Sequence, residues 1–374
     1  MAINLRSPYY IGTTYTNTAY GTLNISIWDG NYTSPVTAQY SLRKSAIGSS
    51  VDVFFEISEL IKDYIDITFN GDYAGQTVWV NTVRNAYDSN NNVINSTPIT
   101  GTQLAFDGYS YFEEVQASTP PVLISNRELF VLDDNTFRVP IYTLTNPVVT
   151  FFKDGEVIAS ETFSSGSESA NQIKYVSIYG DDVNYDTFQE RVVETGGSYE
   201  LNNCLQSFFD NFSIGAVDKI TVSDSNGIET IKVNVIEECK YEPKKVTFIN
   251  KFGALQDMYF FKKSKENLTI KKESYKANII SASGTYDYTN HVNRDFNVVG
   301  KESISLSSGY LSEEYNEVFK QLLLSEKVWV TNIIESGEQV LPINVKTSSI
   351  AYKTSVNDKL VDYTIEFDKS FDTI

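Results

Sequence analysis

The strongest constraint on the fold is a two-residue period of apolar side chains that recurs in short runs along the chain. Runs such as "TLNISIW", "TAQYSLRK" and "SVDVFFEI" place an apolar residue at every second position. This is the period of a strand with one buried face, and the abundant Val, Ile, Thr, Tyr and Phe suit a pleated surface. Turn pairs separate the runs, and the Asp-Gly of "KDGE" is typical of a tight hairpin. The sequence therefore predicts a mainly β protein.

The chain has 374 residues, which is too long for one ordinary core. Its hydrophobic fraction of 41% is enough to fill more than one. Pro120 and Pro121 in "QASTPPVLIS" favour a linker, and a switch from acidic to basic residues follows near Cys239. We therefore predict tandem β-sandwich domains. The first spans 1–118, the second is immunoglobulin- or fibronectin-like and spans 119–238, and a C-terminal sandwich or barrel spans 239–374.

One amphipathic helix is predicted at 312–325 within the last region. Ser312 is a suitable N-cap, and the two glutamates after it favour the positive end of the helix dipole. The apolar residues recur with helical spacing and form one stripe: Tyr315, Val318, Phe319, Leu322 and Leu323. A shorter helix is predicted after Ser58, which is a candidate cap for "SELIKDYID".

The net charge of −18 argues against binding of nucleic acid or anionic membranes by the whole protein. No apolar run is long enough to span a membrane, and the N-terminal residues lack the apolar segment of a signal peptide. We expect a protein made and kept in the cytoplasm unless other machinery exports it. Five acidic residues gather in the second region, where we expect a solvated face and no calcium site: Asp181, Asp182, Asp186, Glu190 and Glu194.

The sequence contains no recognisable catalytic or metal-binding constellation. His291 is the only histidine, no "GxSxG" motif is present, and Cys204 and Cys239 are expected to be free thiols. One histidine with two distant cysteines does not supply a zinc site, and no glycine-rich phosphate loop occurs. We therefore predict no catalytic residue, no cofactor, no metal and no enzymatic activity. Three tryptophans lie in strand-like runs and are expected in cores: Trp28, Trp79 and Trp329.

A basic stretch, Lys244–Lys276, stands out in this acidic chain with nine lysines. Its lysines gather at the ends of apolar runs and in "KKSKEN", which is predicted to be a loop, and Gly253 lies where an unusual backbone conformation is expected. Tyr259 and Phe261 share one strand face with Phe260 opposite, so some of these rings must point inward. A nucleic-acid site would need them on one open face, and complementary faces of an assembly subunit are the better interpretation. The predicted assembly interface comprises Lys251, Phe252, Gly253, Lys262, Lys263 and Lys265.

Three segments of the last region, "FINKFGALQDMYFFKK", "EEYNEVFKQLLLSEKVWV" and "VLPINVKTSSIAYKTSVNDKLVDYTIEFDKSFD", resemble structural proteins of tailed bacteriophages of Bacteroidetes-type hosts. The pattern is a hairpin, a helix leading to a "VWV" strand, and a closing strand. The resemblance implies a non-enzymatic virion subunit in the tail, the baseplate or the tail–head junction. It implies partners that are further copies in a ring and other virion proteins, and it implies no transferable functional residue.

A second interpretation of the sequence is a carbohydrate-binding or adhesive module of a tail fibre or surface protein. Its basis is the aromatic content of 13%, since exposed aromatic rings on one sheet face can stack against sugars.

Overall fold

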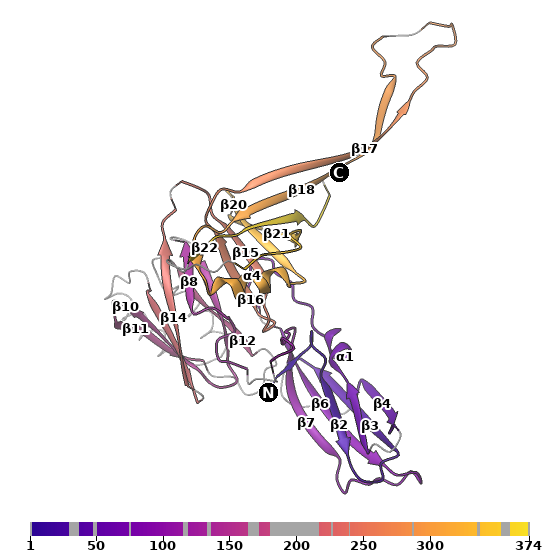
Figure 1. Ribbon diagram of the computed structural model, residues 1–374, viewed down its shortest axis with the longest axis vertical. Helices are drawn as coiled ribbons and strands as arrows, with labels where there is room; N and C mark the ends of the chain where they lie inside the picture. Colours follow the sequence, from indigo (N-terminus) through magenta and orange to yellow (C-terminus); the bar gives the residue numbers. More distant parts are fainter. Residues whose placement is uncertain are drawn as a thin grey trace, which may run out of the picture. The chain divides into compact units, whose positions relative to one another are not determined.

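A computed structural model shows a protein built almost entirely from β-sheets (Figure 1). It describes residues 2–29, 37–47, 51–74, 76–114, 119–132, 136–163, 172–179, 217–225, 227–238, 240–285, 288–334, 337–352 and 360–372. Strands make up 54% of these residues and helices 5%, which confirms the predicted β-sandwich-type fold. By compactness the chain divides into two units. Unit 1 comprises Met1–Glu237, Thr247–Met258 and Glu314–Ser325, and unit 2 comprises Glu238–Val246, Tyr259–Glu313 and Glu326–Ile374.

The N-terminal part of unit 1 consists of two sheets. The larger has the order β1 (Ile3–Asn4), β7 (Ile99–Phe106), β6 (Thr77–Tyr87), β3 (Tyr20–Trp28) and β4 (Tyr40–Ser45). The smaller pairs β2 (Tyr10–Thr14) with β5 (Asp52–Glu56), and the short helix α1 (Ser58–Lys62) follows directly. Ile57 occupies the N-cap of α1 without a side-chain bond, so Ser58 is the first helical residue and not the cap.

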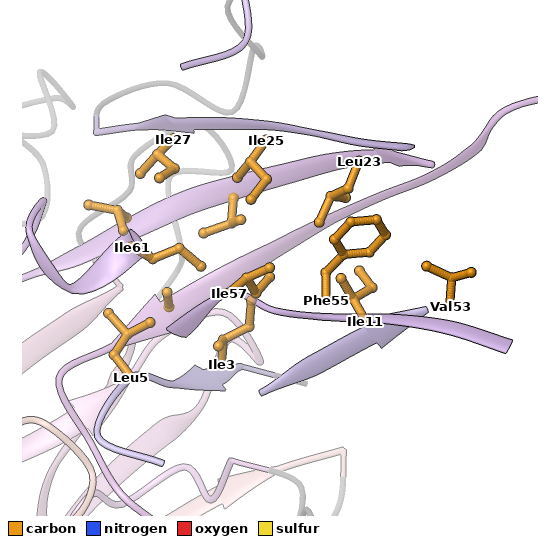
Figure 2. Close-up of a cluster of buried hydrophobic side chains, with 13 residues drawn as sticks. Ile3, Leu5, Ile11, Leu23, Ile25, Ile27, Val53, Phe55, Ile57 and Ile61 are labelled. Carbon is orange, nitrogen blue, oxygen red and sulfur yellow. The ribbon is translucent and has the colours of Figure 1, made fainter. Parts of the chain in front are cut away.

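The alternating side chains of these strands form one core (Figure 2). Leu23, Ile25 and Ile27 of β3 point toward the side of the core that holds Phe55 of β5 and Ile61 of α1, and all five are buried. Their alternation with polar residues is the pattern from which the strands were predicted, because only one face of each strand meets the core.

The second part of unit 1 also has two sheets. One has the order β11 (Glu156–Thr162), β10 (Val148–Lys153), β13 (Lys219–Asp224), β14 (Gly227–Ile236) and β8 (Glu128–Leu132). The other pairs β12 (Ile173–Tyr179) with β9 (Thr136–Tyr142). Asp154 and Gly155 connect β10 to β11 with φ angles of 51° and 85°, so the predicted Asp-Gly hairpin is confirmed.

The last region contributes a seven-stranded open sheet. Its order is β16 (Leu255–Phe260), β15 (Lys244–Ile249), β20 (Val328–Ile334), β21 (Gly337–Val345), β23 (Thr364–Lys369), β18 (Asn293–Ser307) and β17 (Lys265–Lys276). Every residue of β16 is buried. Within unit 2 the ring centroid of Tyr259 lies 5.8 Å from that of Phe261, and that of Phe260 lies 6.2 Å from that of Phe367. The aromatic residues of this strand are therefore buried on both faces, as expected.

The second helix, α4, is shorter than predicted. It spans Tyr315–Leu323, with Glu314 at its N-cap. Ser312 instead lies in the two-residue strand β19 (Leu311–Ser312), where it pairs with Leu360 of β22 (Leu360–Val361). The assignment of Ser312 as the cap is therefore wrong, because Ser312 is held in a strand pair and the N-cap lies two residues further on, at Glu314. Four residues of the predicted stripe are buried and Leu323 is half-buried: Tyr315, Val318, Phe319 and Leu322.

The β15–β16 turn and α4 belong to unit 1 because they bond to its second sandwich region. The Asn250 side-chain amide donates to the carbonyl of Leu123 (2.6 Å), and that of Gln321 donates to Ser125 Oγ (2.6 Å). The backbone N–H of Leu255 donates to the buried Tyr175 hydroxyl (3.0 Å). The boundaries at 118 and 238 drawn from the sequence stay predictions.

Candidate assembly surface

The most exposed regular element of the described chain is a long antiparallel ribbon in unit 2. Strands β17 and β18 pair from Lys265 with Ser305 to Lys276 with Asn293. Strand β23 pairs only with Ser303–Ser307 of β18, so the ribbon has two strands beyond that point. Figure 1 shows β17 and β18 continuing past the other strands of their own sheet. We call residues 265–285 and 288–302 the arm, and all twelve residues of β17 are exposed.

Apolar side chains lie on both faces of the arm. Leu268 and Ile270 share one face by strand period and are 56% and 57% exposed. Tyr275 and Phe296 lie on the opposite face, 48% and 46% exposed, with their ring centroids 5.7 Å apart in an edge-to-face arrangement. A two-stranded ribbon without packing on either face is marginally stable in water. In the isolated chain, the apolar side chains on both faces of the arm therefore remain exposed to solvent.

A bulge separates the two apolar groups. The register shifts between Lys271 and Glu273, and Asn297 in the opposite strand has a φ of 50°. The side-chain amide of Asn297 donates to Glu273 Oε1 (3.3 Å) across the ribbon. Bulges bend a strand and increase its twist, and they re-aim the side chains that follow. Here the bulge lies between Ile270 on one face and Tyr275 on the other.

The arm also carries cations that have no ionic partner among the described residues. Lys272 pairs with Asp295 across the ribbon (Nζ to Oδ2, 2.7 Å). Among the described residues, four other arm cations form no ion pair: Lys265, Lys271, Lys276 and Arg294. Their charges are exposed, and they are available to an acidic partner.

Three of the six residues predicted for the interface lie in the turn between β15 and β16, in unit 1. The ammonium group of Lys251 pairs with Glu114 Oε1 (2.8 Å), and the backbone N–H of Phe252 donates to Asn250 Oδ1 (2.9 Å). Gly253 is buried with a φ of 72°, which confirms the expected unusual backbone. A Cβ atom at Gly253 would lie 2.8 Å from the backbone of Asp107. This turn makes contacts within its own unit.

The other three predicted residues lie at the base of the arm in unit 2. Lys262 Nζ pairs with Glu238 Oε2 (3.0 Å), and the hydrogen bond from Lys262 lowers the pKa of the Glu238 carboxyl. Lys263 is exposed in the loop, and Lys265 is the first residue of β17. The structure thus brings only Lys265 onto the arm, and the lysines of "KKSKEN" are not all in a loop. Leu268 and Ile270 alternate over two positions only, which is too short a pattern to identify the strand from the sequence.

The described residues contain no candidate metal site. They contain no cluster of three or more His, Cys, Asp or Glu able to hold a metal ion. His291 is exposed beside the start of β18, and its neighbours form no such group. Trp79 and Trp329 are buried, as expected of core residues, and Trp28 is half-buried. Both cysteines and the acidic cluster at 181–194 lie outside the described residues.

Unit 1 has a cavity of about 430 Å³ beside its N-terminal strand, lined by Asn4, Arg6, Tyr9 and Tyr111 among others. Two of its polar side chains are engaged within the protein. The Tyr111 hydroxyl donates to Glu317 Oε1 (2.7 Å), and the Arg6 guanidinium donates to the carbonyl of Leu324 (2.6 Å). These groups hold α4 in place, and the cavity is a poorer candidate than the arm.

No protein-family model matches the chain, and no curated protein matches it. Within the described part of the structure, neither helix has the length and apolar character needed to cross a membrane.

Proposed function

We propose that the chain is a non-enzymatic structural subunit of a tailed-phage particle, in the tail, the baseplate or the tail–head junction. It is made in the host cytoplasm and acts through contacts with further copies, arranged in a ring, and with other virion proteins. The arm carries this proposal. Exposed apolar residues on both faces of a long ribbon favour a role in which another surface covers them.

Two further features support an assembly role. The last region resembles tailed-phage structural proteins in the order of its hairpin, helix and strands, and the structure has β15–β16, α4 and β20 in that order. The charges are also segregated along the sequence. Residues 1–238 carry 12 basic and 30 acidic residues, whereas residues 239–374 carry 18 of each. Residues 1–238 therefore carry the whole net negative charge, and the basic stretch Lys244–Lys276 lies outside them, which favours contacts between that stretch and the acidic part of another copy.

The carbohydrate-binding alternative predicts several aromatic rings open to solvent on one sheet face. Trp79 and Trp329 are buried, and the exposed rings of Tyr275 and Phe296 pack edge-to-face against each other. The buried tryptophans favour the structural role, whereas Tyr10 and Phe54, which are 61% and 48% exposed on one face of the β2–β5 sheet, are the rings that the alternative would use. Strong, saturable binding on a glycan array by the purified chain would support the alternative instead.

The proposal is tested by quantitative mass spectrometry of phage particles purified by density gradient from a culture that expresses the chain. We expect the chain to be a fixed component, present in multiple copies and retained through a second gradient. Absence of the chain from purified particles, with the capsid and tail proteins detected, would show that it is not a virion subunit.

A further inference from the structure

We propose that the arm binds a second copy of this chain, which covers both faces of the ribbon. The inference rests on the proposed function of the chain as an assembly subunit, and it identifies the partner and the contact. Its first support is that the apolar side chains are divided between the two faces, with Leu268 and Ile270 opposite Tyr275 and Phe296. A partner that covers one face alone leaves the other apolar pair in water.

The second support is charge. Four arm cations have no ion pair among the described residues, and the net charge of −18 is carried entirely by residues 1–238. These four cations can pair with acidic residues of another copy of the same chain, whose residues 1–238 carry an excess of 18 negative charges. Complementary potentials steer association and exclude partners of the same sign. A second copy is therefore the partner that the charges of this chain favour.

The third support is the free edge of the sheet. Strand β17 is the last strand of the seven-stranded order, so its outer backbone groups have no strand neighbour among the described residues. Exposed edges are templates for pairing with another chain, and lysines on them limit indiscriminate pairing. The four lysines of β17 fit this pattern, since they allow contact with an acidic surface and oppose contact with another arm.

The direct test removes the distal arm and keeps its base. In this variant residues 270–300 are replaced by Asn-Gly, which joins Thr269 to Lys301, two residues that pair across the ribbon. The buried side chains Ile304 and Leu306 at the base of β18 are retained. We expect the full chain to self-associate in sedimentation velocity at up to about 100 µM, a hundredfold above a micromolar Kd. We expect the truncated chain to stay monomeric, with an unchanged Tm.

Matched point variants test whether both faces take part. Leu268→Thr with Ile270→Thr alters one face, and Tyr275→Thr with Phe296→Thr alters the other, while threonine keeps strand propensity. We expect each pair to weaken self-association by at least about tenfold, because apolar contact area is lost from the interface. The control is Val157→Thr with Ile228→Thr, at strand positions outside the arm that are 56% and 72% exposed, and it should associate like the unaltered chain.

Added salt gives a second measurement, since screening should weaken association between 50 mM and 500 mM NaCl. Three results would overturn the inference: a full chain that is monomeric throughout, a truncated chain that associates as the full chain does, or an effect confined to one face. The outcome is separate from that of the proposed function. A chain that is absent from virions but needs its arm to self-associate refutes the function alone.

Discussion

Both the backbone conformation and the packing at position 253 require a residue without a side chain. The φ of Gly253, 72°, lies in the left-handed region, and a Cβ atom there would overlap the backbone of Asp107 and Gly108. A side chain in this conformation costs about 1–2 kcal/mol before any overlap is counted. The turn between β15 and β16 therefore depends on this glycine.

We expect Gly253→Ala to lower the free energy of unfolding by at least about 2 kcal/mol, because strain and overlap both oppose it. Urea titration followed by circular dichroism measures the change. Gly101→Ala is the matched control, since the added Cβ would meet only Thr82 Oγ1 at 3.9 Å, and its effect should stay within about 0.5 kcal/mol. Equal stabilities for the two variants would contradict the packing seen at Gly253.

Buried tyrosines should make the protein sensitive to alkali. Burial raises the pKa of Tyr142 to about 12 and raises the pKa values of Tyr73, Tyr175 and Tyr315 above their usual range. Each folded-state pKa lies above that of the unfolded chain, so the stabilising contribution is complete below pH 10. It is lost above pH 10, where the unfolded chain releases protons that the folded chain retains.

We therefore expect the free energy of unfolding to fall between pH 10 and 11.5, with each buried tyrosine contributing up to about 1.4 kcal/mol per pH unit. Urea titrations at a series of pH values measure this slope. Tyr142→Phe should make the slope shallower, because one of the linked groups is removed. A stability that is constant up to pH 11.5 would show that these hydroxyls are accessible in the folded protein.

At the scale of elements, helix α4 is the best example of what sequence pattern can and cannot establish. The spacing of Tyr315, Val318, Phe319 and Leu322 predicted a helix with one buried stripe, and all four are buried. The N-terminus was misplaced, because Ser312 pairs with Leu360 in a distant segment. A local capping signal carries no information about such a pairing.

The arm, in contrast, is an element that the sequence pattern did not predict. A half-buried strand such as β3 can be predicted because apolar and polar residues alternate along it. Strand β17 is exposed along its whole length, so no buried face imposes that two-residue pattern. The sequence pattern predicts its lysines at strand ends and in a loop, whereas Lys271 and Lys272 lie in mid-strand. The conformational requirement of Gly253 could be read from the sequence, and the ribbon that presents Leu268 and Phe296 could not.

We expect Leu322→Ala in α4 to lower the free energy of unfolding by about 2–5 kcal/mol, because this side chain is fully buried and its removal leaves a cavity. Thermal unfolding followed by circular dichroism gives the comparison. Leu324→Ala is the control one residue past the helix, where the side chain is 48% exposed and a change below about 1 kcal/mol is expected. A small effect at Leu322 would mean that α4 contributes little to unit 1.

At the scale of the whole molecule, composition and compactness divide the chain differently. The switch from acidic to basic residues falls near Cys239, yet residues 247–258 and 314–325 fold as part of unit 1 with the first two regions. Hydrogen bonds from Asn250 to Leu123 and from Gln321 to Ser125 account for this, and such long-range bonds leave no periodic trace in the sequence.

The central claim is that the arm is exposed in the single chain and covered by a second copy in the assembly. Hydrogen–deuterium exchange, measured on the dissociated and the assembled protein, tests it most directly. We predict that residues 265–276 and 293–302 exchange rapidly in the dissociated chain and become protected on assembly, while buried β6 exchanges slowly in both. Arm exchange that is the same in both states, with assembly verified by sedimentation, would contradict the claim.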